Sequence, residues 1–539
     1  MKRTPLLLLA GLVLGIPLLL LAGHPVRSGE ARGAMVSVAQ EPDTLDPYLS
    51  PQQSTSTLAA LFYSGLVSLD DHGRWIPDLA ERVPTLENGG VTLAGGGMRV
   101  KFRLRPNLRW QDGQPLTSAD VAATWKLVMD RRFPTVSTEG YDRIARIETP
   151  DPRTAVMVFK TPYAPYLELL PFILPAHVIA ASANPAQAAW NRQPLGSGPY
   201  RLTRWVSGEE LVMEANPYYY KGTPGIAHLA VRFVPHPGTA FAMFRAGELD
   251  LVTGVPPQEC AAMRAAAPGR VFVTPTSTWE HVVFNLKSPI LADKRVRQAI
   301  ARLIDRKELA DKAYGRMLTP AYSEVPTVSW AYDPRVATFN PYDPTSAGAL
   351  LDAAGWKRGP DGIRVKDGRK LTLGLLTTSD NPSRALAAQI WRRQWRSAGI
   401  SLDIEQQPAS AVFGSAATGG RLATGKFDLA LVASVSRPDP DSSYRWRSDQ
   451  VPPNGANQSR YANPVVDRLL DEGQQTIDRS ARVRLYAQLA EHLADDLPVV
   501  PLLYTVNIDA TSKRLVGFRP NPTLRGDFWN VSSWKLGNP

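Results

Sequence analysis

The chain has 539 residues, of which 44% are apolar and 21% charged, so it is long enough for two or three globular units and too apolar for a disordered chain. Its formal net charge is +11, from 61 basic and 50 acidic residues. The basic residues are scattered, whereas nucleic-acid-binding proteins gather them on one face beside stacking aromatics, so we expect no nucleic-acid partner.

The N-terminus is typical of an export signal. Lys2 and Arg3 precede an apolar run, Leu6–Ala22, which is short for a membrane span. We predict that residues 1–33 are a signal peptide; an uncleaved N-terminal anchor is the alternative. The one cysteine, Cys260, excludes an intrachain disulfide and favours a packed structural thiol. Because no cysteine stands at a cleavage point for lipid attachment, we expect a protein free in the periplasm.

Short segments rich in branched and aromatic residues, with turn formers nearby, predict strands along the whole chain. In chain order these strands are Val36–Ala39, Val100–Arg105, Ala155–Phe159, Leu211–Ala215, Leu229–Val234, His281–Leu286, Leu371–Leu376, Leu402–Glu405, Phe427–Ala433 and Val499–Tyr504.

Helices are predicted between them from capping residues and apolar spacing. Thr117 and Asp120 form the pattern of a capping box. The predicted helices run from Thr117 to Met129, from Asp293 to Gly315, from Pro382 to Gly399, from Asn463 to Glu472 and from Ser480 to Pro498. Strands and helices mixed in this way indicate an α/β protein.

Motifs for catalysis fail when they are tested. Gly196-Ser197-Gly198-Pro199-Tyr200 has the wrong spacing for a nucleophile elbow, and no phosphate or dinucleotide loop is present. None of the seven histidines pairs with another four residues away. The run from Asp439 starts like a calcium loop but has Tyr444 and Gln450 where glycine and glutamate are needed. We therefore predict no catalytic residue, no metal site and no cofactor.

Several short motifs occur together in a fixed order. They include Glu41-Pro42-Asp43-Thr44-Leu45-Asp46-Pro47, Trp110-Gln111-Asp112-Gly113, Pro194-Leu195-Gly196-Ser197-Gly198-Pro199-Tyr200, Arg295-Val296-Arg297-Gln298-Ala299-Ile300 and Tyr461-Ala462-Asn463-Pro464. In this order they resemble the extracytoplasmic solute-binding proteins of peptide-type ABC transporters, the dipeptide, oligopeptide and nickel receptor family. The resemblance covers nearly the whole chain after the signal segment.

The resemblance implies an α/β periplasmic-binding-protein fold with two hinged lobes and an additional small subdomain. It places 35–48, 192–276 and 499–535 in the core of lobe I, 49–191 in the extra subdomain and 277–498 in lobe II. It also implies a monomer that binds without turnover and delivers its solute to an ABC permease in the inner membrane.

In the family, two segments usually line the ligand cleft, here Ser50–Ser54 and the run from Ser434 to Tyr444. A tryptophan before a lobe-crossing strand is a further candidate, with a core position as the alternative. The predicted cleft residues are Gln52, Gln53, Trp279, Ser436, Arg437, Asp439, Asp441 and Tyr444.

The ligand stays open at this point. Ser436 stands where peptide-binding members commonly carry an aspartate for the peptide's ammonium, so Asp439 or Asp441 would have to replace it. Arg437 and Arg445 suit an anionic group, and Arg437 and Asp439 either pair with each other or each contact the ligand. The candidates are a receptor for a peptide or peptide-like solute, a receptor for an acidic non-peptide such as a phosphorylated sugar conjugate, and, in another class, a secreted hydrolase.

Overall fold

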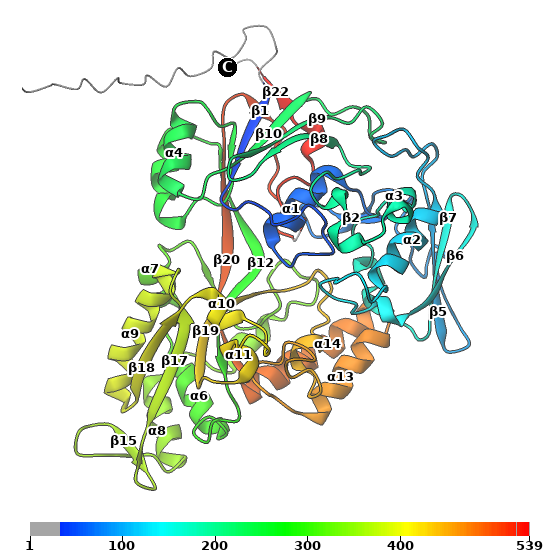
Figure 1. Ribbon diagram of the computed structural model, residues 1–539. Helices are drawn as coiled ribbons and strands as arrows, with labels where there is room; N and C mark the ends of the chain where they lie inside the picture. The colour runs from blue at the N-terminus through cyan, green and yellow to red at the C-terminus, as the bar shows by residue number, and fades with distance from the viewer. Residues whose placement is uncertain (1–32, 524, 538–539) are drawn as a thin grey trace, which may run out of the picture.

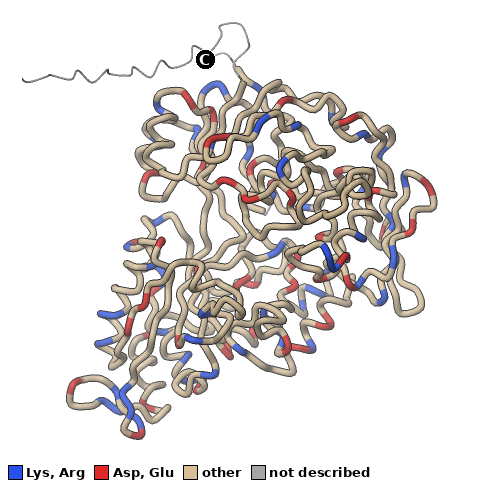
Figure 2. Tube along the Cα trace, viewed as in Figure 1, with Lys and Arg blue, Asp and Glu red and all other residues tan. Residues whose placement is uncertain are grey.

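The computed structural model describes residues 33–523 and 525–537 (Figure 1). The predicted signal peptide lies outside the described residues except for Gly33. No helix among the residues described is long and apolar enough to cross a membrane. Figure 1 shows two bodies joined by a pair of strands, β12 (Val271–Phe284) and β20 (Val499–Thr511). In Figure 2 basic and acidic residues are interspersed over both bodies.

One large mixed sheet runs through both bodies. Besides β12 and β20 it contains β1 (Ala34–Val38), β8 (Tyr200–Val206), β9 (Glu210–Ala215), β10 (His228–Phe233), β11 (Leu251–Val252), β13 (Thr319–Pro320), β17 (Thr372–Thr378), β18 (Ser401–Gln407) and β19 (Leu429–Val435). The strand order is β18-β17-β19-β12-β20-β11-β1-β10-β9-β8, and β13 pairs with β20 beside it.

A second sheet has the order β4-β5-β7-β6, made of β4 (Val91–Ala94), β5 (Gly97–Arg103), β6 (Ile144–Asp151) and β7 (Thr154–Phe159). Gly95 and Gly96 turn the β4–β5 hairpin with φ values of 59° and 79°, which glycine adopts without strain. The remaining short strands are β2 (Val67–Leu69), β3 (Trp75–Pro77), β14 (Lys357–Arg358), β15 (Arg364–Lys366), β16 (Arg369–Lys370), β21 (Leu515–Val516) and β22 (Lys535–Leu536).

The α-helices cover the faces of these sheets. They are α1 (Gln53–Phe62), α2 (Ser118–Val128), α3 (Ala176–Ala181), α4 (Pro237–Arg245), α5 (Cys260–Ala266), α6 (Lys294–Arg302), α7 (Arg306–Ala313), α8 (Pro344–Ala353), α9 (Pro382–Ala398), α10 (Ala409–Phe413), α11 (Arg421–Thr424), α12 (Ser443–Trp446), α13 (Pro464–Gln475) and α14 (Arg479–Asp496). The 3-10 helices are η1 (Tyr141–Arg143), η2 (Ala164–Glu168), η3 (Pro185–Gln187), η4 (Ala189–Asn191), η5 (Pro257–Glu259), η6 (Pro334–Thr338) and η7 (Val531–Ser533).

Side-chain caps account for several helix starts. The capping box of Thr117 and Asp120 is present at α2, as the sequence predicts. The single helix predicted from Asp293 to Gly315 is wrong, because the chain forms α6 and α7 there. The carboxylate of Asp305 accepts hydrogen bonds from the backbone N–H groups of Lys307 and Glu308 and so starts a new helix.

Buried apolar residues form separate cores in the two bodies. One set comes from residues 34–267 and 508–534, and we call the body around it the first lobe. The other comes from residues 279–504 and defines the second lobe. The chain changes lobe within β12 and again within β20. The exact limits of the lobes and of the small subdomain stay a prediction.

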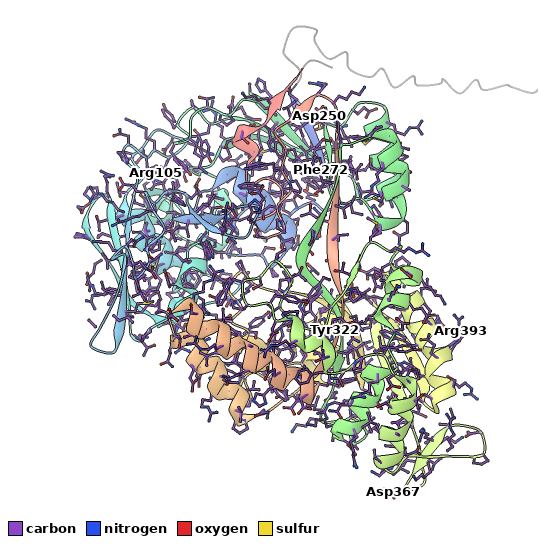
Figure 3. The ribbon with its side chains drawn as sticks, turned by 180° about the vertical axis from the view of Figure 1, so that it is seen from behind. Arg105, Asp250, Phe272, Tyr322, Asp367 and Arg393 are labelled. Atoms are coloured by element: carbon purple, nitrogen blue, oxygen red, sulfur yellow. The ribbon has the colours of Figure 1, made fainter. Side chains whose placement is uncertain are left out.

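The two crossing strands carry irregular pairing where the cores change. β12 and β20 are antiparallel, with register shifts between Pro275 and Trp279 and between Glu280 and His281. Seen from behind in Figure 3, the two strands run side by side from the region of Phe272 towards that of Tyr322. Bulges of this kind bend a strand and interrupt its hydrogen bonding locally. The pairing of the two crossing strands is therefore least regular where the chain leaves the first lobe.

Candidate functional site

Two adjoining cavities lie where the lobes face each other. The large chamber has a volume of about 740 Å³ and is lined by first-lobe segments 72–87 and 164–168 and second-lobe segments 326–330, 437–439 and 477–482. The small chamber, of about 310 Å³, is lined chiefly by first-lobe residues between 47 and 172, together with Arg437, Pro438 and Arg525. The chambers share Trp75, Leu167, Glu168, Arg437 and Pro438.

The segment after β19 reaches into this cleft. Its first part is fixed to the second lobe and the crossing strand, because the Ser436 hydroxyl donates to the carbonyl of Glu324 at 2.6 Å and its N–H to that of Ser277 at 2.8 Å. The next part touches the first lobe. Arg437 Nη2 lies 2.6 Å from Glu139 Oε2, and the Asp439 N–H donates to Glu168 Oε1 at 2.6 Å. These two contacts bridge the lobes.

Arg437 and Asp439 do not pair with each other, so that alternative is wrong. Asp439 is instead held by Arg482 on α14, with nitrogen–oxygen distances of 2.7 and 2.5 Å, and both side chains are buried. Burial opposes the charge of Arg437, but Glu139 and Glu168 outweigh it and raise the pKa of Arg437. The chain passes between the two lobes at this point. Arg437 therefore reaches an acidic residue of the first lobe, and Asp439 reaches an arginine of the second.

Glu168 is an acidic residue of the cleft without a close ion pair in the described part of the chain. It is half-buried at the end of η2, and no ion pair to it lies within 4.0 Å among the described residues. Burial, and then repulsion from Asp439, raise the pKa of Glu168 to about 8. A carboxyl group in this position gains from a cation placed beside it.

The other predicted residues take different places. Asp441 and Tyr444 lie with Ser436 around a cavity of about 20 Å³ that adjoins the large chamber through Arg437 and Asp439. The guanidinium of Arg437 lies 4.6 Å from the Tyr444 ring centroid. Asp441 accepts from Gln474 at 2.8 Å, and burial raises its pKa.

Gln52, Gln53 and Trp279 line neither chamber. Gln52 precedes α1, and Gln53 is exposed. Trp279 is fully buried, and its ring stacks on His281 with 4.0 Å between centroids. In this structure Trp279 therefore serves the core of the second lobe, which is the alternative weighed from the sequence.

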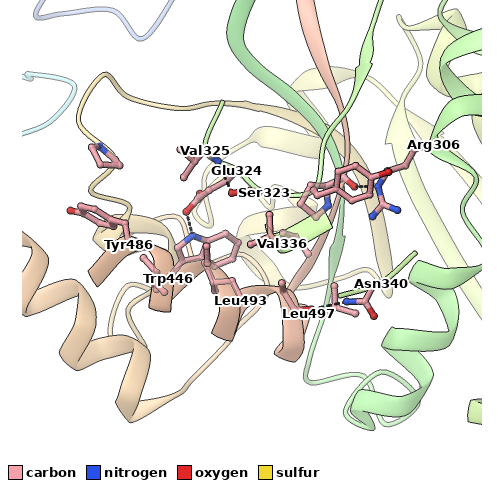
Figure 4. Close-up of a pocket in the computed structure, with 17 residues that line it drawn as sticks. Arg306, Ser323, Glu324, Val325, Val336, Asn340, Trp446, Tyr486, Leu493 and Leu497 are labelled. Atoms are coloured by element: carbon pink, nitrogen blue, oxygen red, sulfur yellow. Dashed lines mark hydrogen bonds between the residues drawn. The ribbon is translucent and has the colours of Figure 1, made fainter. Parts of the chain in front are cut away.

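A further cavity, of about 40 Å³, lies inside the second lobe (Figure 4). Figure 4 shows Glu324 accepting a hydrogen bond from Trp446 Nε1, at 2.5 Å. The space holds at most a few water molecules. The backbone carbonyl of Glu324 also accepts the hydrogen bond from the Ser436 hydroxyl, so a wall residue of this cavity supports the cleft segment.

Sequence reasoning missed Glu139, Glu168, Arg482 and Arg525. Glu139 and Glu168 lie 298 and 271 residues from the partners they contact across the cleft. The run from Pro162 to Leu167, just before Glu168, is rich in aromatic residues and proline. This composition could have indicated that the segment lines the cleft. Among the described residues no three His, Cys, Asp or Glu side chains are grouped so that they could hold a metal ion.

Two lobes joined by paired crossing strands, with a lined cleft between them, define a two-lobed binding protein. The model of the bacterial extracellular solute-binding proteins, family 5, matches residues 74–454. The chain belongs to this family, which is extracytoplasmic and consists of binding proteins, as the order of motifs predicts.

Relatives and solved structures agree along most of the chain. Protein XP55 of Streptomyces lividans is 29% identical over 468 residues, 86% of this chain and 82% of that protein. The oligopeptide-binding protein AppA of Bacillus subtilis is 25% identical over 526 residues, covering 96% and 93%. The structure of NikZ from Campylobacter jejuni in complex with Ni(L-His) has a TM-score of 0.79 and 23% identity, covering 93% of this chain and 99% of that one. The two-lobed α/β fold is confirmed.

Proposed function

We propose that this protein captures a peptide or peptide-like solute between its lobes and delivers it to the membrane permease of an ABC importer. The observation that carries the proposal is the pair of adjoining chambers lined by both lobes and bridged by Arg437 and Asp439. Their volumes of about 740 and 310 Å³ are in the range of sites for organic ligands. Support comes also from relatives named for oligopeptide and glutathione binding.

Mixed charge in the large chamber supports a zwitterionic ligand. Its lining includes the basic residues Arg74 and Arg479 and the acidic residues Glu87, Glu168 and Asp478. A peptide carries an ammonium at one end and a carboxylate at the other, so it can complement both signs. A solute with several phosphates would meet the carboxylates unfavourably.

The remaining parts of the proposal concern the protein as a whole. We propose a monomer that binds without turnover and uses no cofactor, exported by residues 1–33 and not lipid-anchored, with its lobes divided near residues 277 and 499. Cleft residues are proposed to be Ser436, Arg437, Asp439, Asp441 and Tyr444, joined by Glu168.

The test is native mass spectrometry of the protein purified from its own periplasm, followed by release of the bound material with denaturant. We expect peptides or peptide-like molecules in the released fraction, and calorimetry with the same molecules should give one site per chain. A phosphorylated sugar conjugate in that fraction would replace the peptide with the acidic solute. Cleavage of a peptide library, abolished by one point substitution, would instead indicate a hydrolase.

A further inference from the structure

The small chamber has walls made of aromatic rings. Tyr48, Trp75, Tyr141, Tyr163 and Phe172 all line it. The hydroxyl of Tyr48 donates to the carbonyl of Phe172 at 2.5 Å, and that of Tyr141 accepts from the backbone N–H of Leu170 at 3.1 Å. Because backbone groups hold these two hydroxyls, the rings are fixed in place as rigid walls. Such walls favour a flat apolar group that packs edge-to-face or offset against them.

One cation in this chamber lacks a close anionic partner. Four charged residues line it: Glu139, Glu168, Arg437 and Arg525. Arg437 is paired with Glu139. Arg525 has no ion pair within 4.0 Å among the described residues, and burial lowers its pKa, offset in part by the charge of Asp78.

Backbone contacts and a ring set the position of Arg525. Its Nη2 donates to the carbonyls of Val67 at 3.1 Å and Pro171 at 3.2 Å, and the guanidinium lies 4.9 Å from the centroid of the Phe172 ring. Asp78, the acid whose charge acts on Arg525, is itself bonded to Tyr220 and Lys221. Because the two hydrogens of Nη2 are used on the two backbone carbonyls, the donors left for a ligand are those of Nη1 and Nε. A fixed guanidinium with these donors beside a ring wall is suited to a carboxylate, which it can bind with a charge-assisted hydrogen bond.

We infer that the small chamber binds an aromatic residue together with its carboxylate, the ring among the tyrosines and the carboxylate on Arg525. This inference rests on the proposed function. If the ligand is a peptide, the group in the small chamber is its C-terminal aromatic residue. The peptide then passes Glu168 and Arg437, which both chambers share, into the large chamber. The specificity of this receptor is therefore set at the C-terminal end of its ligand.

Calorimetry on the mature chain tests this with four probes: Ala-Ala-Phe, its C-terminal amide, Ala-Ala-Ala and N-acetylphenylalanine. We expect the free acid of Ala-Ala-Phe to bind roughly 10- to 100-fold more tightly than the amide, the range of a hydrogen bond to a charged group. We expect a similar preference for Ala-Ala-Phe over Ala-Ala-Ala from burial of the ring.

Two variants locate the effect. Arg525→Gln should bring the acid-to-amide ratio close to one while it keeps the preference for phenylalanine. Arg519→Gln is the matched control, because Arg519 lies on the same C-terminal segment, is exposed and lines neither chamber; it should keep both ratios. Arg525→Lys should restore part of the ratio if the charge is what matters.

The outcomes separate this inference from the proposed function. If the wild-type protein binds acid and amide equally, or phenylalanine and alanine equally, the inference is wrong and the peptide receptor stands. If only N-acetylphenylalanine binds, and Arg525→Gln abolishes it, the inference stands and the peptide is wrong. If no probe binds, the inference is wrong, and the mass spectrometry described above decides the proposed function. The two decisive ratios are measured on the wild-type protein, so a variant that fails to fold does not obscure them.

Discussion

The ion pair between Arg437 and Glu139 joins the lobes, so its loss should shift the protein towards an open form. Glu139→Gln removes the charge and keeps the shape. The side chains of Arg437 and Glu139 are 33% and 28% exposed, and pairs in such partly solvated positions contribute up to about 1 kcal/mol. This corresponds to about a fivefold change in the equilibrium between open and closed forms. Because the ligand-bound form is closed, the apparent Kd should rise by about the same factor.

Calorimetry with the identified ligand measures this change, and small-angle X-ray scattering of the ligand-free protein reports the opening directly. Added salt should weaken binding by the wild type more than by the variant, since salt screens the pair that the variant lacks. Glu405→Gln is the control, because Glu405 pairs with Arg421 at comparable exposure, 39% and 29%, within the second lobe. An unchanged Kd, or an equal loss in the control, would refute the reasoning.

Two further predictions concern charged residues of the cleft. Burial, and then repulsion from Asp439, raise the pKa of Glu168 from its ordinary 4.5 to about 8. Because opening the cleft would return this carboxyl to water and move it away from Asp439, the closed ligand-free form should bind one proton more than the open form. The closed form should therefore be fully favoured below pH 4.5, and this preference should be lost as the pH rises through about 8. Scattering between pH 5 and 9 should show this expansion, and an equal response in Glu168→Gln would contradict it. Arg482→Met leaves the carboxylate of Asp439 buried without its partner and should lower the free energy of unfolding by about 3–5 kcal/mol in urea titrations; a loss under 1 kcal/mol would show that the pair is not structural.

Local signals predicted the elements of the fold well. The capping box at Thr117 depends on residues three apart, and the chain forms it as predicted. The break between α6 and α7 was missed because apolar spacing continues from Val296 through Ile304. Asp305 interrupts the helix by hydrogen bonding, which spacing alone does not reveal.

The sequence predicted those site residues that lie close to a recognisable strand or motif along the chain. Arg437 and Asp439 follow a predicted strand whose end faces the cleft, and both line the large chamber. Their partners could not be found in the same way, since Glu139 precedes Arg437 by 298 residues and sits on the other lobe. Trp279 was predicted to lie just before a crossing strand, but it lies inside that strand, β12. Whether its side chain is covered depends on how β19 and β20 pack against β12, which the sequence does not show.

The ion pairs of Arg437 and Asp439 change which charged residues should determine ligand specificity. An arginine or aspartate already satisfied by a protein partner gains little from a second counter-charge, so Arg437 and Asp439 are better suited to hold the lobes together than to select a solute. Glu168 and Arg525 have no such partner within 4.0 Å among the described residues, so each can contact a ligand group of the opposite charge. Substitutions of Arg437 should therefore affect all ligands alike, whereas substitutions of Arg525 should affect only those with a free carboxylate.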